Sequence, residues 1–524
     1  MKKRSFLAIM MAGLLFASCD KTNEPNNSVG NGEYESSYIA VSVNSVFDPA
    51  MRADDDYEDG TTEEQKVSTA HFFFFDANGA PFILNSTTLG QEGAELNYIK
   101  RGIEDSGSEV DPNVETITNV VLTIEKETGD YPTQMVVVLN WNYSGDAIAL
   151  EALNKTLIAA ANYKSDAGFL MSNSVYAKTV EGQLTLVNAT PITIENIAKT
   201  PALAQATPVD VYVERVAAKV TVKEQTIQNY NTQVTANGKQ VYAKIVGWDI
   251  NTTMNDSYLV KQIDIANYKD EQLGFTWNDA PYHRSYWATS ANTSLATAFS
   301  WNSLTNESGL YDYCLENTTS TPTKVVIAAQ LVDENDAPLE IARLYSEYYT
   351  TDAIKALVAT ALKDQYYYQK DENTKESILP EHIAFVAAGQ TGQESYSVKY
   401  TLTDAAKALK WFYSEHADNN FEEITADVVI EKLGTLEGAQ IWNGMSYYTV
   451  DIEHLGNNEI TNYAVVRNHS YVITVDGIKG LGTPVYDANN NVATPTEPEE
   501  TSSYVAAQIK VLSWRIVNQN VTLQ

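Results

Sequence analysis

The chain has 524 residues, and at roughly 150 residues per domain this length predicts two or three domains, of which we favour two. Its 35 basic residues stand against 68 acidic ones, and the resulting net charge of −33 repels a phosphate backbone, so nucleic acid is excluded as a partner. A 44% share of hydrophobic residues, with 32 tyrosines and many valines, isoleucines and threonines, favours an all-β fold with a few short helices.

The N-terminus has the pattern of an export signal. Basic residues at 2–4 precede an apolar run over 6–17, which is too short to remain as a membrane span. Residues 16–19 (Phe-Ala-Ser-Cys) are similar to a bacterial lipobox, although Phe16 stands where an aliphatic residue is usual. Small residues directly before a cysteine predict a signal peptide of residues 1–19 and lipidation of Cys19. The alternative is an ordinary cleaved signal with an incidental cysteine.

The second cysteine, Cys314, has no intrachain partner if Cys19 is acylated. Disulfides therefore do not stabilise the expected extracellular fold. We predict that Cys314 is a small buried hydrophobic residue and not a catalytic thiol.

A strand and a cleavable segment are expected next. Residues 20–36 are polar and form a tether, whereas Ile39, Val41 and Val43 alternate on one face of a half-buried strand. Arg52 then precedes an acidic stretch that we expect to be exposed, and a trypsin-like protease selects such an arginine. The alternative is an ordinary surface arginine.

The first folded unit is predicted to contain central strands at 71–75 and 135–139, where the apolar residues are continuous. Between 145 and 160 the apolar spacing fits a covering helix approximately. Residues 209–216 and 218–222 are expected to form the last strand of this unit.

The second unit is predicted to have strands at 241–248, 324–331 and 463–475. Residues 352–362 have a helical apolar stripe of Ile354, Leu357, Val358, Ala361 and Leu362 behind the candidate caps Thr351 and Asp352. Residues 493–500 form a Pro/Glu-rich linker.

The C-terminal residues carry a strand pattern in two parts. Residues 508–516 have apolar side chains on both faces, and in residues 517–524 the apolar Val517, Val521 and Leu523 share one face, with Gln519 as the single polar exception. A terminal strand must either close its own sheet or pair with another molecule, because unpaired edges are costly.

Six segments of the chain, in order, resemble the fimbrilins (type V pilins) of the Bacteroidales, especially the major subunits of short fimbriae. They are Phe169–Ser174, Val213–Val220, His283–Ala288, Tyr313–Asn317, Val465–Tyr471 and Val511–Arg515. The resemblance extends over most of the chain and implies two transthyretin-like β-sandwich domains in tandem. Their expected bounds are 53–225 and 226–516, after a propeptide of residues 20–52.

The resemblance also implies a maturation route. A lipoprotein precursor reaches the outer membrane, an Arg-specific protease cuts between Arg52 and Ala53, and the removable strand with Ile39, Val41 and Val43 leaves. Subunits then join by donor-strand exchange, in which residues 517–524 of one copy pair with the next. The expected donor side chains are Ile516, Val517, Val521 and Leu523.

The expected function is therefore structural: the shaft subunit of a cell-surface fimbrium that supports adhesion, co-aggregation and biofilm formation. The implied partners are further copies in a head-to-tail polymer, fimbrial tip and anchor subunits, and receptors on host or bacterial surfaces. The alternatives are a monomeric surface lipoprotein that binds glycan or protein, and a tip or anchor subunit.

No enzymatic activity and no cofactor are expected. The chain lacks the HExxH, GxSxG and phosphate-loop motifs. Its histidines have no short metal-ligand spacing and are expected to be structural or surface residues: His71, His283, His382, His416, His454 and His469.

Overall fold

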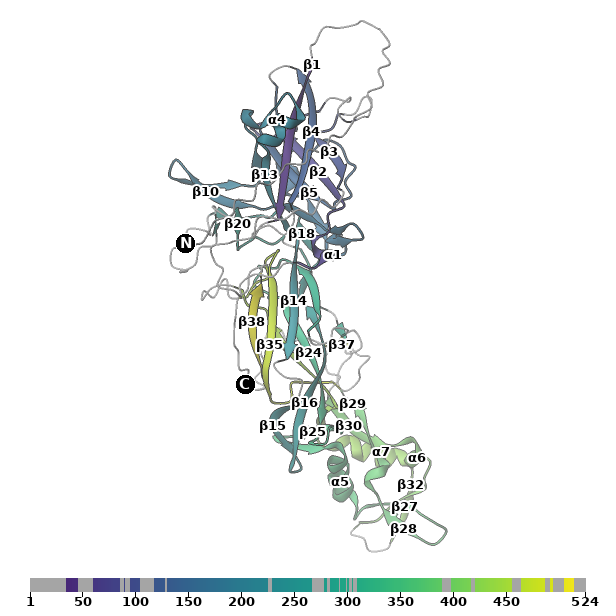
Figure 1. Cartoon of the computed structure of the whole chain (residues 1–524). Helices are drawn as coiled ribbons and strands as arrows, with labels where there is room; N and C mark the ends of the chain where they lie inside the picture. Colours follow the sequence, from purple (N-terminus) through teal and green to yellow (C-terminus); the bar gives the residue numbers. More distant parts are fainter. Residues whose placement is uncertain are drawn as a thin grey trace, which may run out of the picture.

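The computed structural model describes residues 34–45, 60–84, 89, 95–103, 117–127, 130–224, 229–265, 278–279, 283–291, 293–297, 299–300, 304, 309–388, 397–415, 420–454, 463–485, 491–492 and 504–512. Within these residues the molecule is elongated, with an N-terminal sheet, a central sandwich and a smaller third module in a row (Figure 1). Most elements are strands and the helices are short, so the all-β class is confirmed. In the described part of the chain, no helix is both long enough and apolar enough to cross a membrane.

The first sheet has the strand order β3-β2-β5-β9-β13-β1-β4, and β12 pairs with β5. Its strands are β1 (Tyr34–Ser45), β2 (Thr69–Phe75), β3 (Tyr98–Gly102), β4 (Ile117–Glu127), β5 (Gln134–Leu139), β9 (Met171–Asn173), β12 (Thr190–Pro191) and β13 (Val209–Arg215). The predicted central strands at 71–75 and 135–139 are confirmed as β2 and β5.

Both faces of this sheet are covered, which explains the continuous apolar runs. Phe72 and Phe74 belong to one core cluster together with residues of β1 and β4, so the sheet curls around its inner face. Phe73 and Phe75 belong to a second cluster on the other face.

The expected helix over 145–160 is wrong in extent. Only α3 (Leu150–Asn154) is helical, and the following residues form β6 (Leu157–Ala159), which pairs with β18 (Asp256–Tyr258). Pairing with a strand about a hundred residues away overrides the local helical spacing, and Leu157 remains 47% exposed.

The central unit is a sandwich of two sheets around one core, which contains Val220, Trp248, Ile327, Tyr471 and Cys314. One sheet has the order β23 (Tyr311–Leu315), β14 (Ala217–Glu224), β35 (Ser470–Lys479), β38 (Tyr504–Leu512). The other has the order β15 (Tyr230–Ala236), β16 (Lys239–Asn251), β24 (Lys324–Val332), β34 (Met445–Asp451), β36 (Thr483–Val485). The expected strands at 241–248 and 324–331 are found as β16 and β24, and the one at 463–475 is found from Ser470 onward, in β35.

Residues 209–222, expected to form the last strand of the first unit, are divided between the two units. β13 ends at Arg215 in the first sheet, whereas β14 begins at Ala217 and pairs with β23 and β35 of the sandwich. Residues 213–222 are all buried, and a bend at Val216 moves the chain from one sheet to the other. No glycine or proline marks this switch, which is why the sequence did not indicate it.

A third module between β24 and β34 was not predicted. It has its own core, which includes Ile354, Trp411 and Leu433. Its sheets are β26 (Glu347–Thr350), β25 (Ile341–Leu344), β33 (Ala439–Trp442), β30 (Ser397–Leu402), β29 (Ile383–Ala387), and β28 (Lys375–Ser377), β27 (Tyr366–Gln369), β31 (Trp411–Tyr413), β32 (Glu422–Ile424). Its helices are α5 (Thr351–Leu362), α6 (Asp404–Lys407) and α7 (Ala426–Thr435).

The predicted helix at 352–362 is confirmed as α5, with a small difference at its start. The N-cap is Thr350, whose hydroxyl accepts a hydrogen bond from the Ala353 amide at 3.3 Å. Ile354, Val358 and Leu362 are buried, as the stripe predicts, but Leu357 is 46% exposed.

Short elements complete the description. The helices are α1 (Thr62–Gln65), α4 (Pro201–Ala206) and the 3-10 turns η1 (Ala160–Asn162), η2 (Ile194–Asn196) and η7 (Pro380–His382). The strands are β7 (Lys164–Ser165), β8 (Gly168–Phe169), β10 (Tyr176–Val180), β11 (Gln183–Val187), β17 (Thr253–Met254), β19 (Asn278–Asp279), β20 (Arg284–Ser285), β21 (Leu295–Ala296), β22 (Phe299–Ser300) and β37 (Asn491–Val492).

Candidate assembly site

The first strand lies inside its sheet and not at an edge. β1 pairs in parallel with β13, from Val41 opposite Val209 to Ser45 opposite Val213. On its other side it pairs antiparallel with β4, from Tyr34 opposite Glu127 to Asn44 opposite Ile117. Among the described strands, β1 is the sole sheet partner of β4, so β4 is connected to the rest of the sheet through β1.

The side chains of β1 that face the core are aliphatic. Ile39 and Val41 are both 0% exposed and pack in the inner core with Leu122 and Ile124 of β4. Val43 is part of the same strand, but its side chain lies outside the described residues. Residues 37–43 contain no ionisable side chain except the Tyr38 phenol, so hydrogen bonds and apolar burial hold this strand.

A strap at Ala198 pairs with β1 along the edge opposite β4, the same edge that β13 uses. The Tyr38 amide donates to the Ala198 carbonyl at 2.7 Å, and the Ala198 amide donates back to the Tyr38 carbonyl at 3.0 Å. α4, which follows Ala198, contacts both β1 and β4 (Figure 1). β1 is therefore enclosed by two strands and by the segment that leads into α4.

The chain after the predicted cut is anchored by Glu64 of α1. Thr61 and Glu64 form a reciprocal capping box. The Glu64 carboxylate, 0% exposed, lies 3.0 Å from Lys219 Nζ and accepts a hydrogen bond from the Tyr313 hydroxyl at 2.5 Å. Burial raises the pKa of Glu64, but Tyr313, Lys219 and the Thr61 amide together hold that pKa below its ordinary value.

A second ion pair, Arg467 with Glu316, lies fully buried at the junction between the first sheet and the sandwich. Arg467 donates from Nε to Glu316 Oε2 at 2.9 Å and from Nη2 to Oε1 at 2.6 Å, and both side chains are 0% exposed. Arg467 also donates from Nη1 to the Leu259 carbonyl at 3.0 Å. This fork geometry satisfies the guanidinium and the carboxylate together.

A third buried pair, Lys261 with Glu214, holds the segment after β18 against β13 of the first sheet. Lys261 Nζ lies 2.6 Å from Glu214 Oε2 on β13 and donates to the Ser285 carbonyl at 3.0 Å. Burial raises the pKa of Glu214 and lowers the pKa of Lys261, and in each case the partner's charge opposes that shift.

Two histidines at the junction are structural. The Val466 amide donates to the Tyr471 hydroxyl at 2.8 Å, so that hydroxyl donates its own proton to His454 Nδ1 at 2.9 Å. His454 is therefore protonated on Nε2, which donates to the Tyr286 carbonyl at 2.7 Å. Burial lowers the pKa of His469 well below its usual range. In the described part of the chain no cluster of three or more metal-ligating side chains occurs.

The segments that resemble fimbrilins supply many of these junction residues, whereas Glu64, Lys261 and His454 lie outside them. Charged residues inside apolar runs are the signal that could have found the junction, since buried charges require partners. Five of the segments each supply at least one junction residue: Ser172 (through its bond to the Leu259 carbonyl at 2.6 Å), Glu214, Ser285, Glu316 and Arg467.

The other predicted site residues lie outside the described residues. They are Cys19, Arg52, Ala53, Ile516, Val517, Val521 and Leu523. The same holds for His416 and for the 493–500 linker. The described chain ends at Leu512, which pairs with Ser470 at the junction end of β35. Cys314 is buried in the sandwich core, as predicted, and burial raises the pKa of its thiol.

The C-terminal region matches a known family. Residues 440–520, which include β34 to β38 and Arg467, match the family described as major fimbrial subunit protein type IV, fimbrillin, C-terminal. The chain carries a fimbrilin C-terminal region. The fimbrilin resemblance inferred from the sequence is thereby confirmed.

Solved structures with weak similarity include further fimbrial proteins. A fimbrilin from Porphyromonas gingivalis is 15% identical with a TM-score of 0.40, and the match covers 92% of this chain and 98% of that one. A tip fimbrial protein from the same organism, with a C-terminal truncation, is 10% identical with a TM-score of 0.29, and the match covers 91% and 100%. A fimbrial assembly protein from Parabacteroides distasonis is 11% identical with a TM-score of 0.31, and the match covers 75% and 100%. No curated protein matches this chain.

Proposed function

We propose that this chain is the shaft subunit of a cell-surface fimbrium, made as an outer-membrane precursor lipidated on Cys19 and cut between Arg52 and Ala53. The observation that carries the proposal is the position of β1. β1 is an interior strand of its sheet. Its covalent connection to the rest of the described chain runs only through residues 46–59, which contain the proposed cut.

Removal of β1 would leave a slot of defined shape. One edge of β13 and the whole of β4 would lose their hydrogen-bond partners, and Leu122 and Ile124 would lose Ile39 and Val41. Unpaired strand edges are strongly sticky. A strand from another copy restores both ladders by β-augmentation.

The proposed donor is the C-terminal tail of a neighbouring copy. Ile516, Val517, Val521 and Leu523 would each contribute about 1.5–3 kcal/mol when buried, roughly 6–12 kcal/mol before ordering costs. Each backbone hydrogen bond adds about 1 kcal/mol. Such a joint opens only by partial unfolding of the acceptor, so the fibre is kinetically stable.

Cleavage alone does not free the first strand in this proposal. β4 pairs along one edge of β1, and β13 and the strap at Ala198 pair along the other, so the cut strand stays bound until a donor replaces it. Glu64 meanwhile keeps the remaining chain fixed at the junction. In this proposal, strand exchange replaces β1 with a donor strand, and the first sheet and the sandwich keep their positions relative to each other.

Each copy gives one strand and accepts one, so the contact is head-to-tail and does not close. The proposed partners are further copies, tip and anchor subunits, an Arg-specific protease, and receptors on host or bacterial surfaces. The proposed role is structural and adhesive, with no catalytic activity and no cofactor.

The experiment compares Arg52→Ala with Arg101→Ala, which changes an exposed arginine of β3. The first variant should remain a lipidated monomer, and the second should form SDS-resistant fibres like the unchanged protein. Fibres formed efficiently by Arg52→Ala would contradict the processing step.

Deletion of residues 517–524 tests the donor separately. The shortened subunit should fold and be cut, and it should stop elongation when added to growing fibres. If it instead supports fibres of normal length, residues 517–524 are not the donor strand.

A further inference from the structure

A rigid turn and a short helix meet on the outer face of the first sheet. The Asp76 carboxylate accepts hydrogen bonds from the Asn78 and Ala80 amides at 2.8 and 2.9 Å, which fixes the turn after β2. Gly79, at a φ of +78°, places its carbonyl 3.0 Å from the Leu150 amide at the start of α3. A Cβ at Gly79 would lie 3.2 Å from Leu150 Cβ, so turn and helix pack closely.

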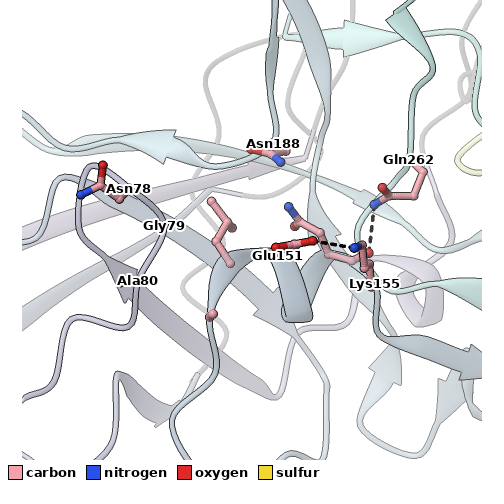
Figure 2. Close-up of a pocket in the computed structure, with 10 residues that line it drawn as sticks. Asn78, Gly79, Ala80, Glu151, Lys155, Asn188 and Gln262 are labelled. Carbon is pink, nitrogen blue, oxygen red and sulfur yellow. Dashed lines mark hydrogen bonds and ion pairs between the residues drawn. The ribbon is translucent and has the colours of Figure 1, made fainter.

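An open pocket of about 480 Å³ lies beside this contact (Figure 2). That volume is within the range of small-molecule sites. All residues that line the pocket come from one subunit, and none of them is part of the assembly site. Its polar side chains are Asn78, Glu151, Asn154, Lys155, Asn188 and Gln262.

One of these side chains is buried without a hydrogen-bond partner. Asn154 is 7% exposed, and its Oδ1 accepts no hydrogen bond from the described residues. Its backbone carbonyl accepts from Gln262 Nε2 at 2.9 Å, which fixes the wall on that side. Buried acceptors without a donor are rare in folded proteins, and they need an explanation.

The side chains that line the pocket indicate which class of ligand it can bind. Four amide side chains line the pocket. Gln262 Nε2 already donates to backbone carbonyls, so this side chain offers its oxygen as an acceptor, whereas the amides of Asn78 and Asn188 supply the donors that adjacent hydroxyl groups also require. Glu151 and Lys155 pair with each other at 2.6 Å, so the rim offers neither sign of charge in excess. No aromatic ring lines the pocket, which gives a flat apolar ligand no platform to stack on.

We propose that this pocket binds a neutral sugar through its ring hydroxyls, one of which donates to Asn154 Oδ1. Figure 2 shows Asn188 and Gln262 on the side of the pocket opposite Glu151, with Asn78 at the far end. The pocket is open to solvent, so the terminal residue of a larger glycan can enter it. The site is complete in one subunit and does not depend on the fibre, although a fibre would repeat it and raise avidity.

The test uses the full-length precursor as a monomer and four probes: the methyl glycosides of mannose, galactose, fucose and N-acetylglucosamine. Saturation-transfer NMR should detect at least one of them, with a Kd on the order of 1 mM, as expected for one shallow site. Asn188→Ala should weaken that binding about tenfold or more. Asn373→Ala, an exposed amide in the distant third module, should leave it unchanged.

Asn154→Leu separates binding from folding. Because it removes a buried unpaired acceptor, it should abolish sugar binding while raising the melting temperature by about 2–4 °C. The proposal is overturned if no glycoside binds more strongly than glycerol, if binding survives both Asn154→Leu and Asn188→Ala, or if Asn154→Leu lowers the melting temperature. None of these results depends on fibre formation, so failure here is distinct from failure of the Arg52 experiment.

Discussion

β1 and the charged junction are held by different kinds of interaction. β1 is bound by two hydrogen-bonded ladders and by Ile39 and Val41, with no ion pair along residues 37–42. At the junction, Arg467 and Glu316 are 0% exposed and fork-paired, and Glu64 and Lys261 have buried partners of their own. A hydrogen-bonded aliphatic strand can be replaced by any strand of the same pattern, whereas a buried ion pair needs its own partner.

The difference assigns separate tasks to the two regions. The Glu64–Lys219 pair links α1 to β14 of the sandwich, and the Lys261–Glu214 and Arg467–Glu316 pairs lie buried at the same junction. Residues 37–43 of β1 carry no charged side chain, and a slot left by them can be filled by another aliphatic strand. In the proposed assembly the junction is the permanent joint, held by ion pairs, and β1 is the exchangeable one, held by hydrogen bonds and aliphatic side chains.

The largest effect is expected from Arg467→Met, because it leaves the Glu316 carboxylate buried without a partner. We expect a loss of about 3–5 kcal/mol in the free energy of unfolding, measured by urea denaturation. The matched control is the double variant Arg467→Met/Glu316→Leu, which removes both charges and should recover most of that loss. A single variant as stable as the unchanged protein would show that the junction is not fixed by this pair.

The next effect concerns the strand. Ile39→Ala should destabilise the uncut precursor by about 2–5 kcal/mol because Ile39 is fully buried, and Ile39→Val should cost only about 0.5–1.5 kcal/mol. In assembled fibres neither change should alter stability, since the strand has left. An equal loss in fibres would mean that β1 stays in its own molecule.

An effect of intermediate size is expected in the pH dependence of stability. It comes from His71 in the first sheet, which belongs neither to β1 nor to the ion pairs of the junction. Burial lowers the pKa of His71 to about 4, against an ordinary value of 6.5. Above pH 6.5 neither the folded nor the unfolded chain binds this proton, so the stabilisation is complete. Between pH 6.5 and 4 the unfolded chain binds it first, and stability falls by up to about 3 kcal/mol.

His71→Phe keeps an aromatic ring in place and should remove this share of the pH dependence. Urea denaturation at pH 7, 5.5 and 4.5 should show a shallower slope for the variant than for the unchanged protein. An unchanged slope would place the titrating groups elsewhere, for example at His469.

The smallest effect is expected in the third module, outside both joints. Leu357→Ala on α5 should change stability by no more than about 0.5 kcal/mol, because that side chain is 46% exposed. Ile354→Val on the same helix, at a fully buried position, should cost about 0.5–1.5 kcal/mol. Melting curves of the two variants should separate clearly, and a larger loss with Leu357→Ala would indicate that another surface covers it.

Strong local patterns made much of the fold predictable. The phenylalanine run of β2, the valines of β5 and the stripe of α5 each determine one element through their spacing. The helix expected near 150 failed because β6 pairs with the distant β18, and no local pattern contains that partner. The bend at Val216 was missed for a similar reason, since a buried run continues across it.

The candidate site was predictable only in part. The alternation of Ile39 and Val41 indicated a strand, but its place between β13 and β4 depends on pairings that a sequence does not display. Many junction residues lie in the segments that resemble fimbrilins, but the sequence alone indicated no structural role for them. Glu316 and Arg467 are 151 positions apart, and only the fold brings them together.

The most direct test of strand exchange is disulfide trapping between two variants. Asn119→Cys lies on β4, opposite Ser42 of β1, and a second set of chains carries single cysteines at positions from 517 to 524. When the two are mixed during assembly, the account predicts covalent dimers that contain one of each chain, vanish on reduction and do not form with Arg52→Ala. Fibres without any such dimer, or a crosslink that forms inside a single uncut molecule, would contradict it.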